Sequence, residues 1–145
     1  MALDETRAIS GTFGEVWREG NQMTQASEMQ AKVKVHKADI KVSGDRWIGK
    51  KVVALEGTGS LKGFKVTSEM LQMHDPVAKN EKGYVKTELI SKLDDPEAYG
   101  CERIRLKNVI FDEIPLVGWK VGEIVEEEWP FTFKGYELLD PIVES

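Results

Sequence analysis

The feature that most constrains the fold is an alternation of apolar and polar, mostly basic, residues that runs from Met29 to Val42. Up to His36 the odd positions are apolar, which is the period of a β-strand with one buried face. After His36 the apolar residues occupy the even positions, and such a one-residue slip predicts a β-bulge or a strand that changes sheets. The strand is too long for a small sheet alone. We therefore expect a hairpin over about residues 29–55 that projects from the body.

Shorter strand patterns flank this hairpin. The first is closed by Gly20-Asn21, a residue pair typical of hairpin turns. The last contains Pro130, which marks an edge strand or a bulge because proline cannot donate a ladder hydrogen bond. The predicted strands lie at Thr12–Arg18, Leu61–Val66, Tyr84–Lys92, Glu102–Phe111 and Ile124–Phe133.

One helix is predicted, over about residues 68–79, because Thr67-Ser68 followed by Glu69 is typical of a helix N-terminus. Pro76 either ends this helix near Asp75 or kinks it towards Asn80. Six or seven antiparallel strands with one helix predict a mainly β fold. We expect a small β-barrel or sandwich with one flanking α-helix and a long projecting hairpin, forming a single domain over residues 1–145.

Composition excludes several classes of protein. The chain has 145 residues, of which 41% are hydrophobic and 31% charged, as in a soluble globular domain. One cysteine, Cys101, excludes a disulfide framework, and two histidines leave little material for metal or triad chemistry. The N-terminal residues lack the basic and apolar regions of a secretory signal, so we expect synthesis in the cytoplasm.

Three local patterns resemble known functional motifs, but each lacks a feature that the motif requires. Gly44–Lys51 approaches a phosphate-binding loop, but Lys51 replaces the hydroxyl residue and no helix pattern follows. His74 and Asp75 are adjacent on the predicted helix and so point to different faces. The carboxylates of Glu126–Glu128 alternate sides on a strand, which disfavours a shared cation. We predict no enzyme, and no catalytic, cofactor or metal residues.

Charge is distributed unevenly along the chain, whose net charge is −5. Residues 123–145 contain seven acids and one base, whereas residues 32–53 contain seven bases and two acids. Such asymmetry indicates either nucleic-acid binding or two complementary surfaces that meet, and two solvated strand faces remain the plain alternative. An acidic chain is poorly suited to tight DNA binding, but it suits DNA that slides past.

Tryptophans also point to an interface. Two of the four, Trp47 and Trp119, fall in turn-like or projecting segments, where aromatic residues are typical of protein–protein contacts. Self-association would also pair the exposed edges of a long hairpin, unless the hairpin folds over its own barrel. The predicted inter-subunit contacts are Lys41, Arg46, Trp47, Lys50, Lys51, Trp119, Glu126, Glu128 and Trp129.

Nearly the whole chain resembles the tail tube proteins of contractile-tailed phages, in the branch of PBSX-like prophages. The resemblance rests on the order of several segments rather than on one motif, and the most specific segment is Glu126–Phe133. The others are the first hairpin after Ile9-Ser10-Gly11, the Lys-rich strand leading to Val42–Arg46, Gly49-Lys50, Gly57-Thr58-Gly59, Lys65–Ser68 and Glu102-Arg103-Ile104.

The resemblance implies a subunit with an N-terminal arm over residues 1–11, six copies of which form a ring. Rings stack into a hollow tube inside a sheath, which drives the tube through the target cell envelope for DNA ejection. The implied partners are other copies of the chain, the tail sheath protein, baseplate or tube-initiator and tail-terminator proteins, the tape measure protein during assembly, and DNA as transient cargo. The implied location is a virion tail or an extracellular bacteriocin particle, and no cofactor is implied.

Two alternatives remain open at this point. The same tube serves contractile bacteriocins, which carry no DNA. A different class is a monomeric β-barrel that binds a small ligand, or a module that binds single-stranded nucleic acid. The nucleic-acid module would need aromatic residues among the bases of one face, and the face that carries Lys32, Lys34 and His36 has none.

Overall fold

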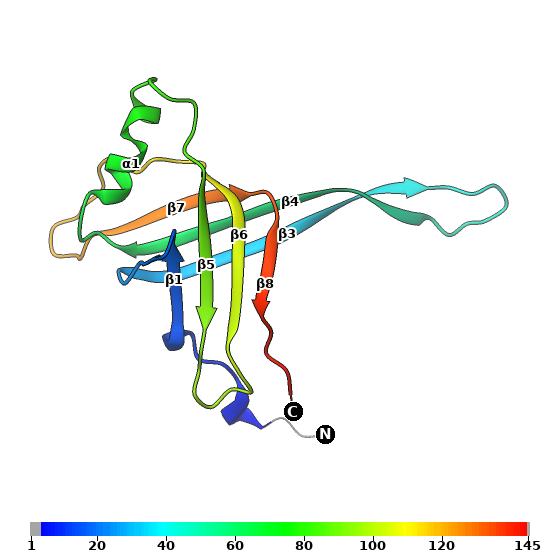
Figure 1. Ribbon diagram of the computed structural model, residues 1–145. Coiled ribbons are helices and arrows are strands. Elements are labelled where there is room, and N and C mark those ends of the chain that lie inside the picture. Colours follow the sequence, from blue (N-terminus) through cyan, green and yellow to red (C-terminus); the bar gives the residue numbers. More distant parts are fainter. Residues whose placement is uncertain (1–3, 145) are drawn as a thin grey trace.

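The computed structural model describes residues 4–144, which form eight strands, one α-helix and two short 3-10 helices (Figure 1). The predicted mainly β fold with one flanking helix and a projecting hairpin is confirmed. The 3-10 helices are Glu5–Arg7 and Gly11–Phe13, and the other elements are β1 (Gly14–Arg18), β2 (Asn21–Gln22), β3 (Ala26–Ile40), β4 (Gly49–Phe64), α1 (Glu69–Ala78), β5 (Thr87–Leu93), β6 (Glu102–Phe111), β7 (Glu126–Phe133) and β8 (Tyr136–Asp140).

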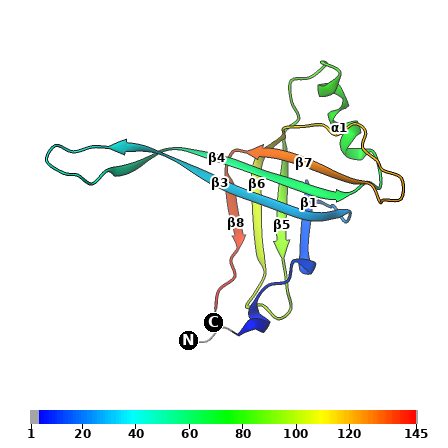
Figure 2. The same cartoon turned by 180° about the vertical axis from the view of Figure 1, so that it is seen from behind.

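The strands form one antiparallel sheet in the order β2-β1-β5-β6-β7-β4-β3, with β8 paired to β6. The sheet folds over into two layers whose strands cross: β1, β5, β6 and β8 form one layer, and β3, β4 and β7 the other (Figures 1 and 2). Strand β6 belongs to both layers, because its first part pairs with β5 and β8 while Ile110 and Phe111 pair with β7. Asn108, with a φ of 53°, lies at the register shift where β6 passes from one layer to the other.

The hydrophobic core lies between the two layers and is dominated by aromatic residues of β6 and β7. Phe131 is fully buried and packs edge-on against Phe111, with ring centroids 5.9 Å apart. Across the strand pair, Phe131 and Phe133 lie over Gly59 and Gly57 of β4, where a side chain would collide with their rings. The buried hydrophobic residues are Val16, Leu61, Leu89, Leu106, Val109, Phe111, Trp129, Phe131 and Phe133.

The long hairpin consists of β3 and β4, which pair from Ala26 opposite Gly63 to Ile40 opposite Gly49. A register shift occurs between His36 and Lys37, at the predicted position, but the extra residue is Val53 of the partner strand. The prediction of a half-buried strand is wrong for the outer part, because the hairpin leaves the body there. Val33 and Val35 are 40% and 46% exposed.

Two other details differ from expectation. The turn between β1 and β2 is made by Glu19 and Gly20, whose φ values of 49° and 86° suit a type I′ hairpin turn, rather than by Gly20-Asn21. Strands β2 and β8 were not predicted, because two and five residues give too short an alternation to recognise.

Helix α1 covers the end of the core formed by β6 and β7. It continues through Pro76 to Ala78, and the chain leaves it at Asn80 with a φ of 61°. His74 is buried beneath the helix, with its ring centroid 5.1 Å from that of Trp129. Asp75 instead pairs with Lys79 at 3.0 Å on the outer side, so the His74-Asp75 pair forms no catalytic unit.

The N-terminal segment lies against the loop between β5 and β6. The backbone N–H groups of Ser10 and Glu97 donate hydrogen bonds to the Asp95 carboxylate. Both bonds, that from Ser10 more strongly, hold the pKa of Asp95 below its usual value. Arg7 donates to the Glu97 carbonyl at 2.7 Å. The predicted arm and single domain, residues 1–11 and 1–145, include Met1–Leu3 and Ser145, which lie outside the described residues.

Candidate assembly surfaces

The projecting end of the hairpin is basic and apolar at once. Residues 41–51 carry four bases and one acid, and Trp47 near the tip is 85% exposed. Lys50 forms an ion pair with Asp39 across the hairpin, while Lys51 lies opposite Ala38 on the next strand position. The hairpin therefore brings together five of the predicted contact residues: Lys41, Arg46, Trp47, Lys50 and Lys51.

A second surface is acidic and consists of the loop between β6 and β7, residues 112–125, with the start of β7. The loop carries three acids and one base, Lys120, which lies 3.5 Å from Glu123. Trp119 is 72% exposed in this loop. Residues 113–118 lie against Glu126–Glu128, so Trp119, Glu126 and Glu128 belong to the same end of the molecule.

These two surfaces occupy opposite ends of the protein. In Figure 1 the tip of the hairpin lies at the right, and the loop and the start of β7 lie at the left. The acidic and basic residues therefore cannot meet within one chain. Their complementary charges can be used only between copies, in a head-to-tail contact.

Trp129 requires a correction. It was expected to contact a neighbouring subunit, but its side chain is 4% exposed and packs against His74 and Phe111. The alternation of β7 turns Trp129 inward with Phe131 and Phe133, whereas Glu126 and Glu128 point outward. Trp129 belongs to the core, and it has no free face for a partner.

The layer of β3, β4 and β7 has one bare face. Figure 2 shows this layer in front of the other, and within residues 4–144 no helix covers it. Strand β3 ends the sheet order, so within the described part of the chain no strand pairs with its outer edge. The register places four glutamates and three lysines on this face, with uncharged residues between them: Glu28, Gln30, Lys32, Lys34, Glu56, Thr58, Ser60, Lys62, Glu126, Glu128, Pro130 and Thr132.

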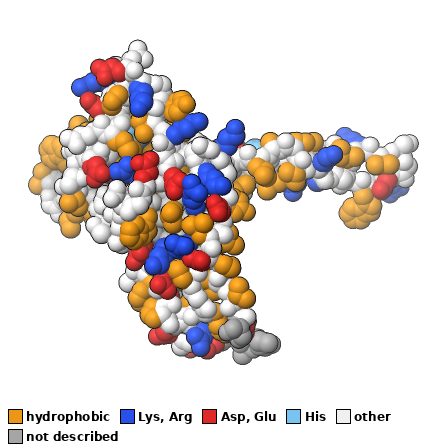
Figure 3. Space-filling model, viewed as in Figure 1, with side chains coloured by type: hydrophobic (Ala, Val, Ile, Leu, Met, Phe, Trp, Pro, Cys, Tyr) orange, Lys and Arg blue, Asp and Glu red, His pale blue; other side chains and the backbone are white. Residues whose placement is uncertain are grey.

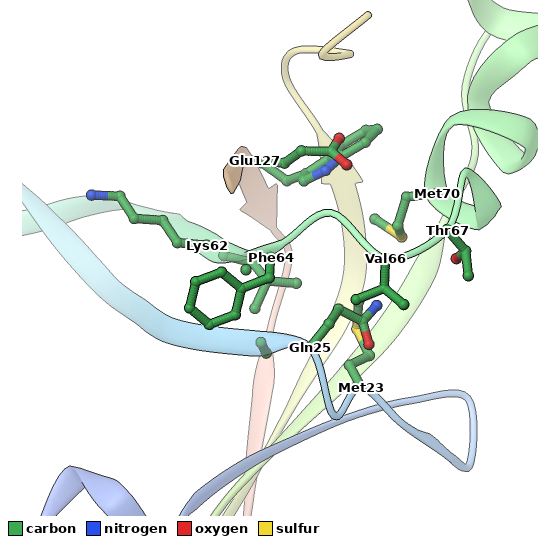
Figure 4. Close-up of a pocket in the computed structure, with 12 residues that line it drawn as sticks. Met23, Gln25, Lys62, Phe64, Val66, Thr67, Met70 and Glu127 are labelled. Atoms are coloured by element: carbon green, nitrogen blue, oxygen red, sulfur yellow. The ribbon is translucent and has the colours of Figure 1, made fainter. Parts of the chain in front are cut away.

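A cavity near the start of α1 gives no support to a ligand-binding function. Met70 reaches towards it from the helix and Met23 from the loop before β3 (Figure 4). Its volume is about 40 Å³, whereas ligand pockets usually measure about 300–1,000 Å³. It is a packing gap next to Trp129. Among the described residues, no group of three or more metal-ligating side chains occurs and no helix is long and apolar enough to span a membrane.

Sequence reasoning missed one further set of surface residues. Tyr136 and Leu138 of β8 are 59% and 50% exposed. They lie on the same side of their layer as the core residue Leu106. The available signal was the alternation that follows Gly135, where Tyr136 and Leu138 flank Glu137.

Comparison with known sequences gives one family and two close relatives. A family model described as phage tail tube protein matches residues 1–140. The uncharacterized protein YqbM of Bacillus subtilis strain 168 is 35% identical over 141 residues, covering 95% of each chain. The phage-like element PBSX protein XkdM of the same strain is 32% identical over 148 residues, covering 100% of this chain and 99% of XkdM.

Solved structures share the fold at low sequence identity. The sheath–tube complex of the extracellular contractile injection system PVC, in its extended state, contains a chain with a TM-score of 0.71 and 8% identity, covering 95% of this chain and 97% of that one. The tube-terminating cap of the anti-feeding prophage gives a TM-score of 0.74 and 9% identity, covering 97% and 95%.

Proposed function

Because this chain belongs to the phage tail tube protein family, we propose that it builds the inner tube of a contractile tail as stacked hexameric rings. Members of this family are structural components rather than enzymes. The observation that carries the proposal is the placement of complementary charged surfaces at opposite ends of one subunit. A contact of that kind is heterologous, and it closes into a ring or continues as a helical stack.

The bare face of β3, β4 and β7 is suited to line the lumen. The other face of that layer is covered by the second layer of strands. If neighbouring copies join through the free edge of β3 to close a ring, the covering layer lies on the outside of that ring. The bare face carries four glutamates and three lysines, so it has no excess of positive charge. A polyanion gains little from counterion release on such a wall. This supports DNA as transient cargo.

The outer layer then faces the sheath. It carries Arg105, which donates to Glu88 at 2.6 Å and lies 3.5 Å from Glu137. The hydrogen bond and charge of Glu88, with a smaller effect of Glu137, raise the pKa of Arg105 above its ordinary value.

We propose that baseplate and terminator proteins bind the two ends of the tube and that the tape measure protein lies inside it during assembly. The assembled tube belongs to a virion tail.

The experiment that tests this function is self-assembly of the purified protein. Light scattering over increasing concentration is expected to rise, and negative-stain electron microscopy is expected to show six-fold rings or hollow tubes. Addition of sonicated tubes as seeds should shorten any lag. A protein that stays monomeric over the whole range, seeds included, would contradict the proposal.

Charge reversal tests the contact between the acidic and basic surfaces. Glu126→Lys with Glu128→Lys, or Lys50→Glu with Lys51→Glu, is expected to raise the concentration needed for assembly by about tenfold at low salt, and less at high salt. A chain that carries both pairs of changes restores complementary charges and should assemble more readily than either double variant. Glu81→Lys, on the exposed turn after α1, is the control. Normal tubes from both double variants at ordinary salt would exclude this charge contact.

A further inference from the structure

The two layers of the protein separate on the side where the hairpin leaves the body. Their inner faces remain apolar there, although no element of the described chain covers them. Val35 and Leu55, on the hairpin, are 46% and 67% exposed. Tyr136 and Leu138 belong to β8, which runs below the hairpin in Figure 1, and they are also exposed. Figure 3 shows hydrophobic side chains along the inner part of the hairpin and along the adjoining edge of the body. The core is thus continued outwards as an open apolar groove.

The groove includes a cavity of about 250 Å³ between β3 and the strands β6 and β8. Met29, Ala31 and Val33 of β3 form one wall of the cavity. Ile104 and Leu106 of β6 and Tyr136 of β8 form the opposite wall. Lys32 lies at the rim. A continuous apolar patch of this kind on a soluble protein marks an interaction site.

We infer that the groove receives the loop between β6 and β7 of a second copy, residues 112–125, with Trp119 seated in the cavity. This inference rests on the proposed head-to-tail assembly. The loop lies at the end of the subunit opposite to the hairpin (Figure 1), so one copy can offer its loop while its own groove receives another. An indole side chain supplies a large buried contact area.

Charge distinguishes Trp119 from the other exposed tryptophan, Trp47. The cation Lys32 lies at the rim of the groove, and within residues 4–144 it makes no ion pair. Trp47 lies among the bases of residues 41–51, which Lys32 repels. The loop that carries Trp119 has three acids and one base. The contact then has an apolar centre and a charged rim.

Two variants each remove one half of this contact. Trp119→Ala takes away the inserted side chain, and Ala31→Trp fills the cavity. Each is expected to raise the concentration required for assembly by about thirtyfold, the effect of losing a central tryptophan. Circular dichroism should show unchanged folding, because both residues are exposed. Tyr84→Ala, which removes another aromatic ring that is 53% exposed, is the control and should assemble like the wild type.

Mixing the two variants tests the direction of the contact. The first keeps an intact groove and the second an intact Trp119, so one productive interface remains per pair. Sedimentation of the equimolar mixture is expected to show a dimer that neither variant forms alone, and no rings. If both variants assemble like the wild type, or the mixture forms no dimer, the inference is overturned and the proposed tube function stands. A wild-type protein that never associates would contradict the tube function itself.

Discussion

Truncation of Phe131 to alanine is expected to lower the free energy of unfolding of the monomer by about 4 kcal/mol, a large share of the stability of a domain of this size. Phe131 is fully buried at the meeting point of the two layers. It packs against Phe111 of β6 and over Gly59 of β4. The loss combines the transfer of a ring from the core with a cavity that β-strands on both sides cannot close.

Denaturant unfolding measured at low protein concentration checks this value, because association would add to the apparent stability. Trp47→Ala is the matched control. It removes an aromatic side chain that is 85% exposed. The free energy of unfolding should therefore change by less than about 0.5 kcal/mol. An equal effect of the two truncations would contradict the placement of the core.

Replacement of Gly59 by alanine is expected to cost about 3 kcal/mol, although it adds only one methyl group. The new Cβ would overlap the carbonyl oxygen of Gln30 and lie 2.6 Å from Cζ of Phe131. Neither neighbour can move freely, because Gln30 belongs to the paired strand β3 and the Phe131 ring is enclosed by the core. The overlap can be removed only if β3 and β4 separate locally.

The matched control for this change is Gly83→Ala. Nothing lies within 4 Å of a Cβ at Gly83. Its replacement should leave stability unchanged or raise it slightly, because alanine restricts the unfolded chain. Thermal or denaturant unfolding of the two variants compares them directly. If Gly59→Ala unfolds at the same denaturant concentration as the wild type, the close packing of β4 against Phe131 is wrong.

The strands and the helix could be predicted because their signals are local. The alternation around Met29–Val35 and the cap before Glu69 each depend on neighbouring residues alone. The side of the hairpin that stays exposed could not be predicted, because the pattern of β3 is the same whether a partner covers it or not. The hairpin turn at Glu19-Gly20 lies one residue before the predicted pair, because Gly20-Asn21 carries an equally good turn signal.

The candidate surfaces were predictable in charge but not in position. The basic and acidic segments follow from a count of side chains, whereas their separation to opposite ends depends on long-range strand pairing. Trp129 shows the limit most clearly. The alternation of β7 already places Trp129 with Phe131 and Phe133, opposite Glu126 and Glu128. Whether that apolar face packs inside the subunit or against a neighbour depends on the pairing of β7 with β4 and β6. Tyr136 was missed because the short strand β8 was missed.

The passage of β6 from one layer to the other has a mechanical consequence. A two-layered wall held together by side-chain packing alone can shear along its midplane when it is pushed from one end. Here the covalent backbone crosses that plane just after Asn108, because Val109 still pairs with β5 while Ile110 and Phe111 pair with β7. Slippage of one layer past the other would have to break those strand pairings. In the proposed tube, each subunit would therefore resist separation of its two layers when the tube is pushed along its axis.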